Sequence, residues 1–113
     1  MGFPRKLSIR TSREIGEVLD KGRRYAAGPL KFYLLETDDP GPNRLAFTVP
    51  RCGRTIVARN RLKRRLQELA RARPLAGSGR LIVIRARDGC YELDFAGLSS
   101  LFGRIVGIIE REK

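Results

Sequence analysis

The chain has 113 residues, with 24 Lys and Arg against 12 Asp and Glu, a net charge of +12 and a pI near 11.0. This length supports one domain with a modest core, and a hydrophobic content of 42% argues against a wholly disordered basic tail. We expect a single RNA-binding domain over 1–113, with a basic N-terminal arm over about 1–10. An anionic membrane surface is a distant second partner. No apolar run suffices for a membrane span and no apolar signal core follows the N-terminus, which predicts a cytoplasmic protein.

The first predicted element is a helix that begins near Ser12, whose side chain can act as the N-cap. Ile15, Val18 and Leu19 recur at helical spacing and form one apolar face. Gly22 follows as a left-handed C-cap. The helix therefore spans about 12–21 and buries one side.

Two or three strands are predicted next. Residues 25–28 form a short extended piece, and the apolar-rich run 30–36 is typical of a strand. The segment 37–43 is rich in Asp, Pro, Gly and Asn, which favour turn geometry. The alternating run 44–49 is a further strand, which we expect to pair with 30–36 as a hairpin.

The second half of the chain predicts a helix, a strand and a closing helix. The first helix follows a basic loop over 51–55 and runs to about Arg73, where Pro74 stops it. The run 81–84 is apolar on both faces, as expected of a central strand. Asp94 is expected to cap the last helix. The apolar stripe of that helix comprises Leu98, Leu101, Phe102, Ile105, Ile108 and Ile109.

These elements predict an α/β (α+β) protein with three helices and about four strands. The order is helix, two or three strands, helix, strand, helix. The passage from Val49 to Leu81 can join parallel strands, for which a right-handed crossover is the default.

The predicted middle helix concentrates the positive charge of the chain. From Arg51 to Arg73 there are nine Arg or Lys and one acidic residue, Glu68. With Leu62 as reference, a helical wheel puts Ala58, Leu66, Leu69 and Ala70 on the same inward face. It puts Asn60, Lys63, Arg64, Gln67 and Arg71 outward, and Arg59, Arg61 and Arg65 on the flanks. Solvated helices usually interleave both signs of charge, so contact with RNA or DNA is favoured over a mere soluble surface.

Catalytic groups are sparse in the sequence. The chain has no histidine, no phosphate-binding glycine loop and no evident cluster of metal-binding carboxylates. Asp38 and Asp39 suit a turn better than a site. Cys52 and Cys90 are isolated, and two inert or semi-buried thiols are favoured over a disulfide. If the protein takes part in chemistry, a partner supplies the reacting groups.

The run from Arg59 to Glu68 resembles the signature of the bacterial ribonuclease P protein subunit, which reads approximately Arg-Asn-x-x-Lys-Arg-x-x-Arg-Glu. The order of the other predicted elements is also similar to that family. The resemblance implies a two-layer sandwich, with three helices on a mixed sheet of about four strands and a left-handed βαβ crossover, similar to a domain of a small-subunit ribosomal protein. It implies a partner RNA that itself removes the 5′ leader from precursor tRNA, using Mg²⁺ bound mainly through RNA. One protein per RNA would bind the catalytic RNA and the leader and lower the Mg²⁺ requirement, so the chain is an enzyme only as part of that holoenzyme.

The resemblance and the basic loop together give two sets of site residues. Candidates for RNA binding are Arg51, Arg54, Arg59, Asn60, Arg61, Lys63, Arg64 and Arg65. Candidates for a cleft between helix and sheet that takes the single-stranded leader are Ile15, Leu19, Tyr33, Thr48 and Gln67. No catalytic residue and no protein-held metal is expected.

The sequence departs from the family pattern at three places. Gln67 replaces the final Arg of the signature, Ile15 and Leu19 replace aromatic residues, and Arg51-Cys52 replaces a Lys-Lys pair. Tyr33 could equally be ordinary strand packing, and Ile15 and Leu19 are most simply the buried face of their helix. A general or ribosomal RNA-binding protein of the same fold is the alternative function.

Overall fold

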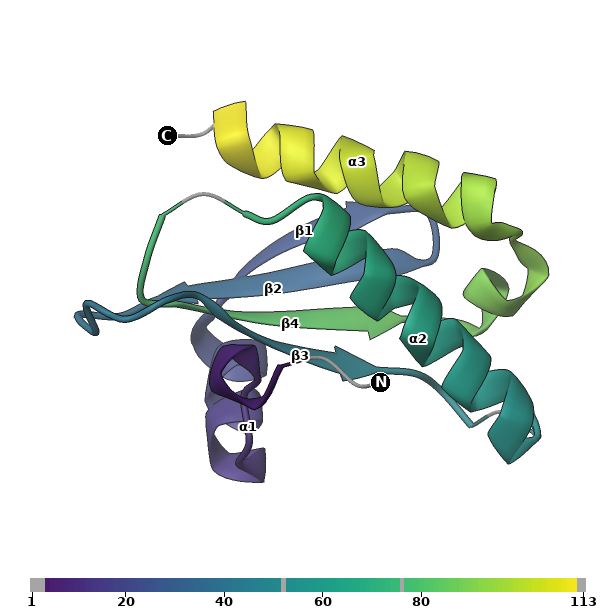
Figure 1. Cartoon of the computed structure of the whole chain (residues 1–113), viewed down its shortest axis with the longest axis horizontal. Coiled ribbons are helices and arrows are strands. Elements are labelled where there is room, and N and C mark those ends of the chain that lie inside the picture. The colour runs from purple at the N-terminus through teal and green to yellow at the C-terminus, as the bar shows by residue number, and fades with distance from the viewer. Residues whose placement is uncertain (1–3, 52, 76, 112–113) are drawn as a thin grey trace.

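The computed structural model describes residues 4–51, 53–75 and 77–111. In chain order the elements are η1 (Arg5–Leu7), α1 (Ser12–Lys21), β1 (Arg23–Ala27), β2 (Leu30–Glu36), β3 (Arg44–Thr48), α2 (Ile56–Ala72), β4 (Arg80–Ala86), η2 (Asp88–Glu92) and α3 (Phe95–Arg111) (Figure 1). The predicted three helices and four-stranded mixed sheet are confirmed. The short helices η1 and η2 were not predicted.

The strands follow the order β1-β2-β4-β3 across the sheet. β1 and β4 both pair antiparallel with β2, whereas β3 pairs parallel with β4. The predicted hairpin between 30–36 and 44–49 is therefore wrong, because β4 lies between these strands. β4 is buried at every position from Leu81 to Ile84, so it takes an inner place, while β3 has only Ala46 buried and lies at the edge.

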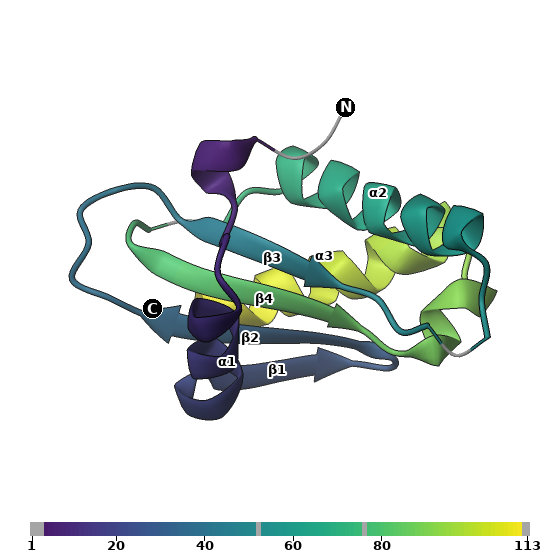
Figure 2. The same ribbon diagram turned by 90° about the horizontal axis from the view of Figure 1, so that it is seen from below.

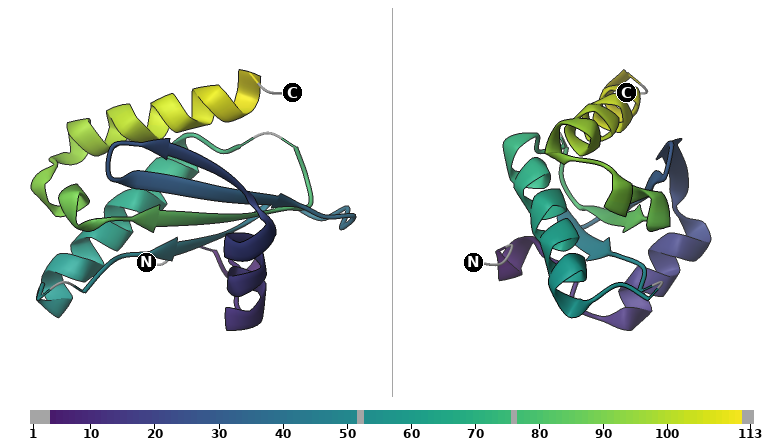
Figure 3. Two further views of the ribbon diagram at one scale, coloured as in Figure 1. Left: turned by 180° about the vertical axis from the view of Figure 1, so that it is seen from behind. Right: turned by 90° about the vertical axis from the view of Figure 1, so that its right-hand side faces the viewer.

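The crossover from β3 through α2 to β4 is left-handed, as the family resemblance implies and against the right-handed default (Figures 1 and 3). α2 shares one face of the sheet with α3. A right-handed path would bring α2 to the opposite face, where α1 and the N-terminal segment already pack on β2, β3 and β4.

Two apolar clusters lie on the two faces of the sheet. The larger cluster fills the layer between the sheet and helices α2 and α3, where the rings of Phe32 and Phe102 meet edge to face with centroids 5.0 Å apart. The smaller cluster joins Val18 of α1 to Tyr33 and Val83 on the opposite face. The expected two-layer sandwich is thus present, and α1 adds a partial third layer (Figure 3).

The ends of the helices match the predicted capping only in part. Asp94 caps α3 as predicted, since its Oδ1 accepts from the Gly97 N–H at 2.8 Å. α1 is capped by Thr11 rather than Ser12, because the Thr11 hydroxyl accepts from the Glu14 N–H. Gly22 is not left-handed (φ −73°). Glycine suits that position for space, because a Cβ there would lie 2.4 Å from the Val18 carbonyl oxygen.

Cys90, within η2, is a buried free thiol. Its Sγ lies 3.5 Å from the Pro29 carbonyl oxygen, and burial raises its pKa. A raised pKa keeps the thiol protonated, which fits the predicted inert role. Cys52 lies outside the described residues.

Candidate nucleic-acid interface

The cationic helix is anchored by its apolar face. Thr55 caps α2, with its hydroxyl accepting from the Ala58 N–H at 3.1 Å. Leu62, Leu66, Leu69 and Ala70 are buried against the sheet and α3, as the helical wheel predicts. The helix is therefore anchored along its inward face, which leaves its outward residues available for contact with a partner.

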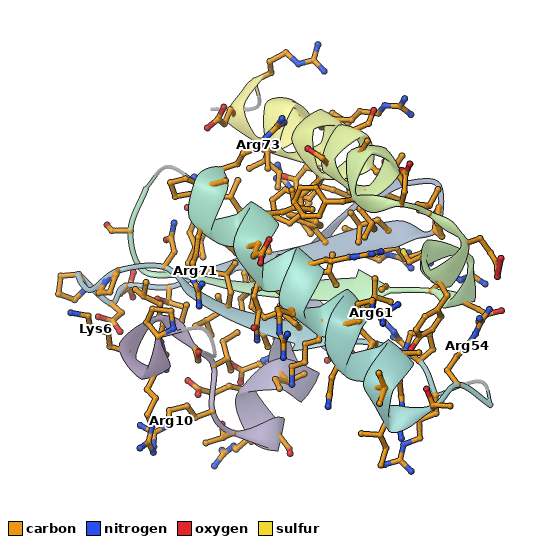
Figure 4. All side chains as sticks on the ribbon, turned by 45° about the vertical axis from the view of Figure 1, so that its right-hand side comes forward. Lys6, Arg10, Arg54, Arg61, Arg71 and Arg73 are labelled. Carbon is orange, nitrogen blue, oxygen red and sulfur yellow. The ribbon has the colours of Figure 1, made fainter. Side chains whose placement is uncertain are left out.

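Several cations lie on the outward face and the flanks of α2. Asn60, Arg61, Lys63 and Arg64 are exposed, and Arg59 and Arg65 are half-buried. Within the described residues none of these cations takes part in an ion pair, although Glu68 lies on the same helix. Figure 4 shows Arg61 and Arg71 on α2, and Lys6 and Arg10 on the N-terminal segment. Among the residues that the structure describes, the guanidinium groups of Arg61 and Arg64 form no ion pair, so phosphate oxygens could occupy their donors without displacing a carboxylate.

Arg54 differs from the other candidates because its charge is already compensated. Its Nη2 lies 2.9 Å from Glu92 Oε2 and its Nε 3.6 Å from Asp88 Oδ1. Its guanidinium also stacks on the Tyr91 ring at 4.7 Å from the centroid. The Glu92 hydrogen bond, supported by the charges of both carboxylates, raises the pKa of Arg54. The side chain thus ties the loop before α2 to η2, whereas Arg51 on the same loop is exposed.

A second basic surface lies on the opposite face of the sheet. α1 crosses only one end of that face and leaves the other end open (Figure 2). A hollow there is lined by Lys31, Tyr33, Pro50, Arg85, Ala86, Arg87 and Asp88. Asp88 is engaged by Arg54, while the three cations have no ion pair within the described part of the chain. The hollow therefore carries a net positive charge beside an aromatic side chain.

The structure brings some of the leader-cleft candidates together and separates others. Tyr33 lines the hollow, although it is 6% exposed and packs under α1, so its strand-packing role is also real. Thr48 lies in one cross-strand row with Arg85, and its buried hydroxyl has no hydrogen-bond partner among the described residues. Ile15 and Leu19 are half-buried against the same cluster as Tyr33. Gln67 lies on α2, on the other side of the sheet from Tyr33.

The hollow depends on residues that the sequence reasoning missed. Lys31 and Arg85 are opposite each other on the two central strands, and Arg87 follows β4. A signal was present, because Lys31 and Arg85 are the charged residues inside the otherwise apolar stretches 30–35 and 81–86, and a charged side chain there points toward solvent or a ligand. Only the pairing of β2 with β4 brings them side by side.

Among residues 4–51, 53–75 and 77–111 no three His, Cys, Asp or Glu side chains gather where they could hold a metal ion. Nor, in that part of the chain, is any helix long and apolar enough to cross a membrane.

The fold and these surfaces define a class: a small α+β protein with a left-handed βαβ unit, a cationic crossover helix and a basic hollow behind it. Two solved structures share this fold. A ribonuclease P protein from Staphylococcus aureus matches with a TM-score of 0.83 and 17% identity, over 91% of this chain and 94% of that one. A ribonuclease P protein from Thermotoga maritima matches with a TM-score of 0.75 and 20% identity, over 88% and 94% of the two chains.

Sequence comparison gives the family directly. A family model described as Ribonuclease P matches residues 3–110. The chain is also similar to the ribonuclease P protein component of Acidothermus cellulolyticus, with 34% identity over 114 residues that cover 98% of this chain and 94% of that protein. The chain therefore belongs to the ribonuclease P protein family, which confirms the resemblance seen in the sequence. This finding favours a ribonuclease P protein subunit over a general or ribosomal RNA-binding protein.

Proposed function

We propose that this chain is the protein subunit of a bacterial ribonuclease P, which removes the 5′ leader from precursor tRNA. The observation that carries the proposal is the outward face of α2, where Asn60, Arg61, Lys63 and Arg64 stand exposed in the signature segment. None of these three cations pairs with a carboxylate of the described residues. This face binds the catalytic RNA, with one protein on each RNA. Arg51, Arg59 and Arg65 extend it at its edges.

The leader of the precursor tRNA is assigned to the hollow on the other face of the sheet. A single strand needs cations for its phosphates and flat or apolar surface for its bases. Lys31, Arg85 and Arg87 supply the cations, and Tyr33 supplies an aromatic side chain in the lining. Ile15 and Leu19 border the same face from α1, where they offer aliphatic rather than aromatic contact.

In this proposal the protein binds RNA and the partner RNA performs the cleavage. The chain has no histidine, so the chemistry belongs to the RNA and to Mg²⁺ that the RNA holds. Positive charge from the protein would lower the Mg²⁺ concentration that the RNA needs, because it offsets part of the phosphate repulsion that Mg²⁺ otherwise neutralises. The holoenzyme would work in the cytoplasm.

The test is reconstitution from purified components. The protein is mixed with a bacterial ribonuclease P RNA and a precursor tRNA at low Mg²⁺, and release of the 5′ leader is measured. We expect cleavage only when protein and RNA are both present. Tight RNA binding with no stimulation of cleavage would contradict the proposal and favour a general RNA-binding protein.

A second comparison tests the leader site separately. The double variant Lys31→Ala/Arg85→Ala should weaken the affinity of the reconstituted complex for precursor tRNA, while its affinity for tRNA without a leader stays unchanged. Equal weakening for both tRNAs would place these cations against another part of the RNA.

A further inference from the structure

A second hollow lies beside the proposed RNA-binding face, between α2 and the beginning of α3. It is lined by Val57, Asn60, Arg61, Arg64, Arg65, Glu68 and Phe95. Two of these residues are large apolar side chains that reach solvent: Val57 is 68% exposed and Phe95 is 41% exposed. This groove thus combines an aromatic ring and an aliphatic side chain with several cations.

The exposed ring of Phe95 results from the length of α3. Phe95 lies on the same helical stripe as Leu98 and Phe102, both of which are buried under the sheet. The stripe begins one turn before the sheet can cover it, so Phe95 remains at the uncovered end. Asp94 caps this turn through the Gly97 N–H, which stabilises the helix end that carries Phe95. Because Val57 of α2 reaches solvent in the same lining, the two side chains form an exposed apolar patch bordered by charged residues, which favours a role in binding.

The charges around the ring indicate the kind of ligand. Arg61, Arg64 and Arg65 take part in no ion pair within the described residues, and Glu68 is the one carboxylate in the lining. Cations for phosphates and an aromatic surface for a base are together the requirements of an unpaired nucleotide. A second copy of this chain fits poorly, since a symmetric contact would bring these arginines against their counterparts.

We infer that this groove binds an unpaired nucleotide of the partner RNA, with its base stacked on Phe95 and its phosphate on Arg61 or Arg64. The inference rests on the proposed function and deepens it. It adds a base-recognising site to a helix face that otherwise reads only phosphates.

The test separates stacking from charge. Binding of the full chain to a bacterial ribonuclease P RNA is measured over a range of salt concentrations, for the wild type and for Phe95→Ala. Loss of one stacked base should weaken binding by about 5- to 150-fold. The slope of log affinity against log salt should stay unchanged, because no phosphate contact is lost.

A fluorescent variant provides an independent readout. The chain has no tryptophan, so Phe95→Trp introduces a single indole at the groove. RNA should quench its emission, since an aromatic base would stack on the ring. Ser100→Trp is the matched control: it is exposed on the same helix but outside the lining, and its emission should change little.

Several results would overturn the inference. Unchanged affinity of Phe95→Ala, or an unquenched Phe95→Trp, would show that no base occupies the groove, even if the wild type binds RNA as proposed. Self-association of the wild type without RNA, abolished by Phe95→Ala, would assign the groove to a second copy of the chain. If the wild type fails to bind the RNA at all, the proposed function falls and this inference with it.

Discussion

The outward cations of α2 can be tested through the salt dependence of RNA binding. Arg61 and Arg64 are suited to this, because both are exposed and neither has an ion pair within the described residues. Arg59 is a poorer choice, since its buried Nε means that its removal would also disturb packing. We therefore choose the double variant Arg61→Ala/Arg64→Ala.

The expected magnitude follows from the number of phosphate contacts. Each contact contributes about 0.7–0.9 to the slope of log affinity against log salt, so two lost contacts lower its magnitude by about 1.4–1.8. Between 50 and 200 mM salt, the wild type should then lose about 7- to 12-fold more affinity than the variant. Fluorescence anisotropy with a labelled bacterial ribonuclease P RNA measures both slopes.

The control for this experiment must change the net charge equally. Arg104 and Arg111 are exposed on α3, so Arg104→Ala/Arg111→Ala removes two charges away from the α2 face. Its slope should stay near that of the wild type. If the two double variants give equal slopes, binding depends on overall charge and the assignment of the α2 face is refuted.

Two further variants test the leader site and the core. Ile15→Phe should tighten binding of a single-stranded leader by about 5- to 150-fold, because this half-buried position on α1, packed against the same cluster as Tyr33, gains a ring on which a base can stack. Equal affinities would mean that no base reaches this position. Leu66→Ala should lower the free energy of unfolding by about 2–5 kcal/mol, because the side chain is fully buried in the main cluster. Urea denaturation measures this, with Ile56→Ala, an exposed position on the same helix, as the variant expected to change little.

Local patterns in the sequence predicted most of the elements but not their pairing. The helical spacing of Leu62, Leu66 and Leu69 fixed the inward face of α2, and that face is buried as predicted. The hairpin prediction failed because alternation in 44–49 says only that a strand exists. Its partner depends on which strand takes the inner place beside β2. That place is taken by β4, which has four consecutive buried residues, so β3 pairs with β4 at the edge of the sheet.

In the candidate site, too, the features carried by neighbouring residues were predicted, whereas those that depend on strand pairing were not. The signature on α2 could be recognised from the sequence because its residues are close in the chain and lie on one helix. The hollow was not, since Lys31 and Arg85 are far apart in the chain and meet only through the β2–β4 pairing. The partners of Arg54 were also hidden: Glu92 belongs to η2, a short helix without a clear sequence pattern.

Two roles of Arg54 can be distinguished by experiment: a contact with RNA phosphate, or a structural role in holding the loop before α2. The sequence suggests an RNA contact, while the structure shows its guanidinium held by Glu92 and Asp88 and stacked on Tyr91. Tyr91 in turn donates its hydroxyl to the Pro50 carbonyl oxygen at 2.5 Å, so the cluster fastens the loop that leads into α2. We expect Arg54 to orient α2 rather than to bind phosphate.

The two roles predict opposite effects for a change at Glu92. If Arg54 positions the loop, Glu92→Gln and Arg54→Ala should both weaken RNA binding, their effects should not add, and the salt slope should match the wild type. If Arg54 instead contacts a phosphate, Arg54→Ala should lower the slope by about 0.7–0.9. Glu92→Gln should then strengthen binding, because it removes a competing carboxylate from the guanidinium. The sign of the Glu92→Gln effect on affinity decides between the two roles. A structural role of Arg54 needs the Glu92 carboxylate, so its loss weakens RNA binding, whereas a phosphate contact of Arg54 is hindered by that carboxylate, so its loss strengthens binding.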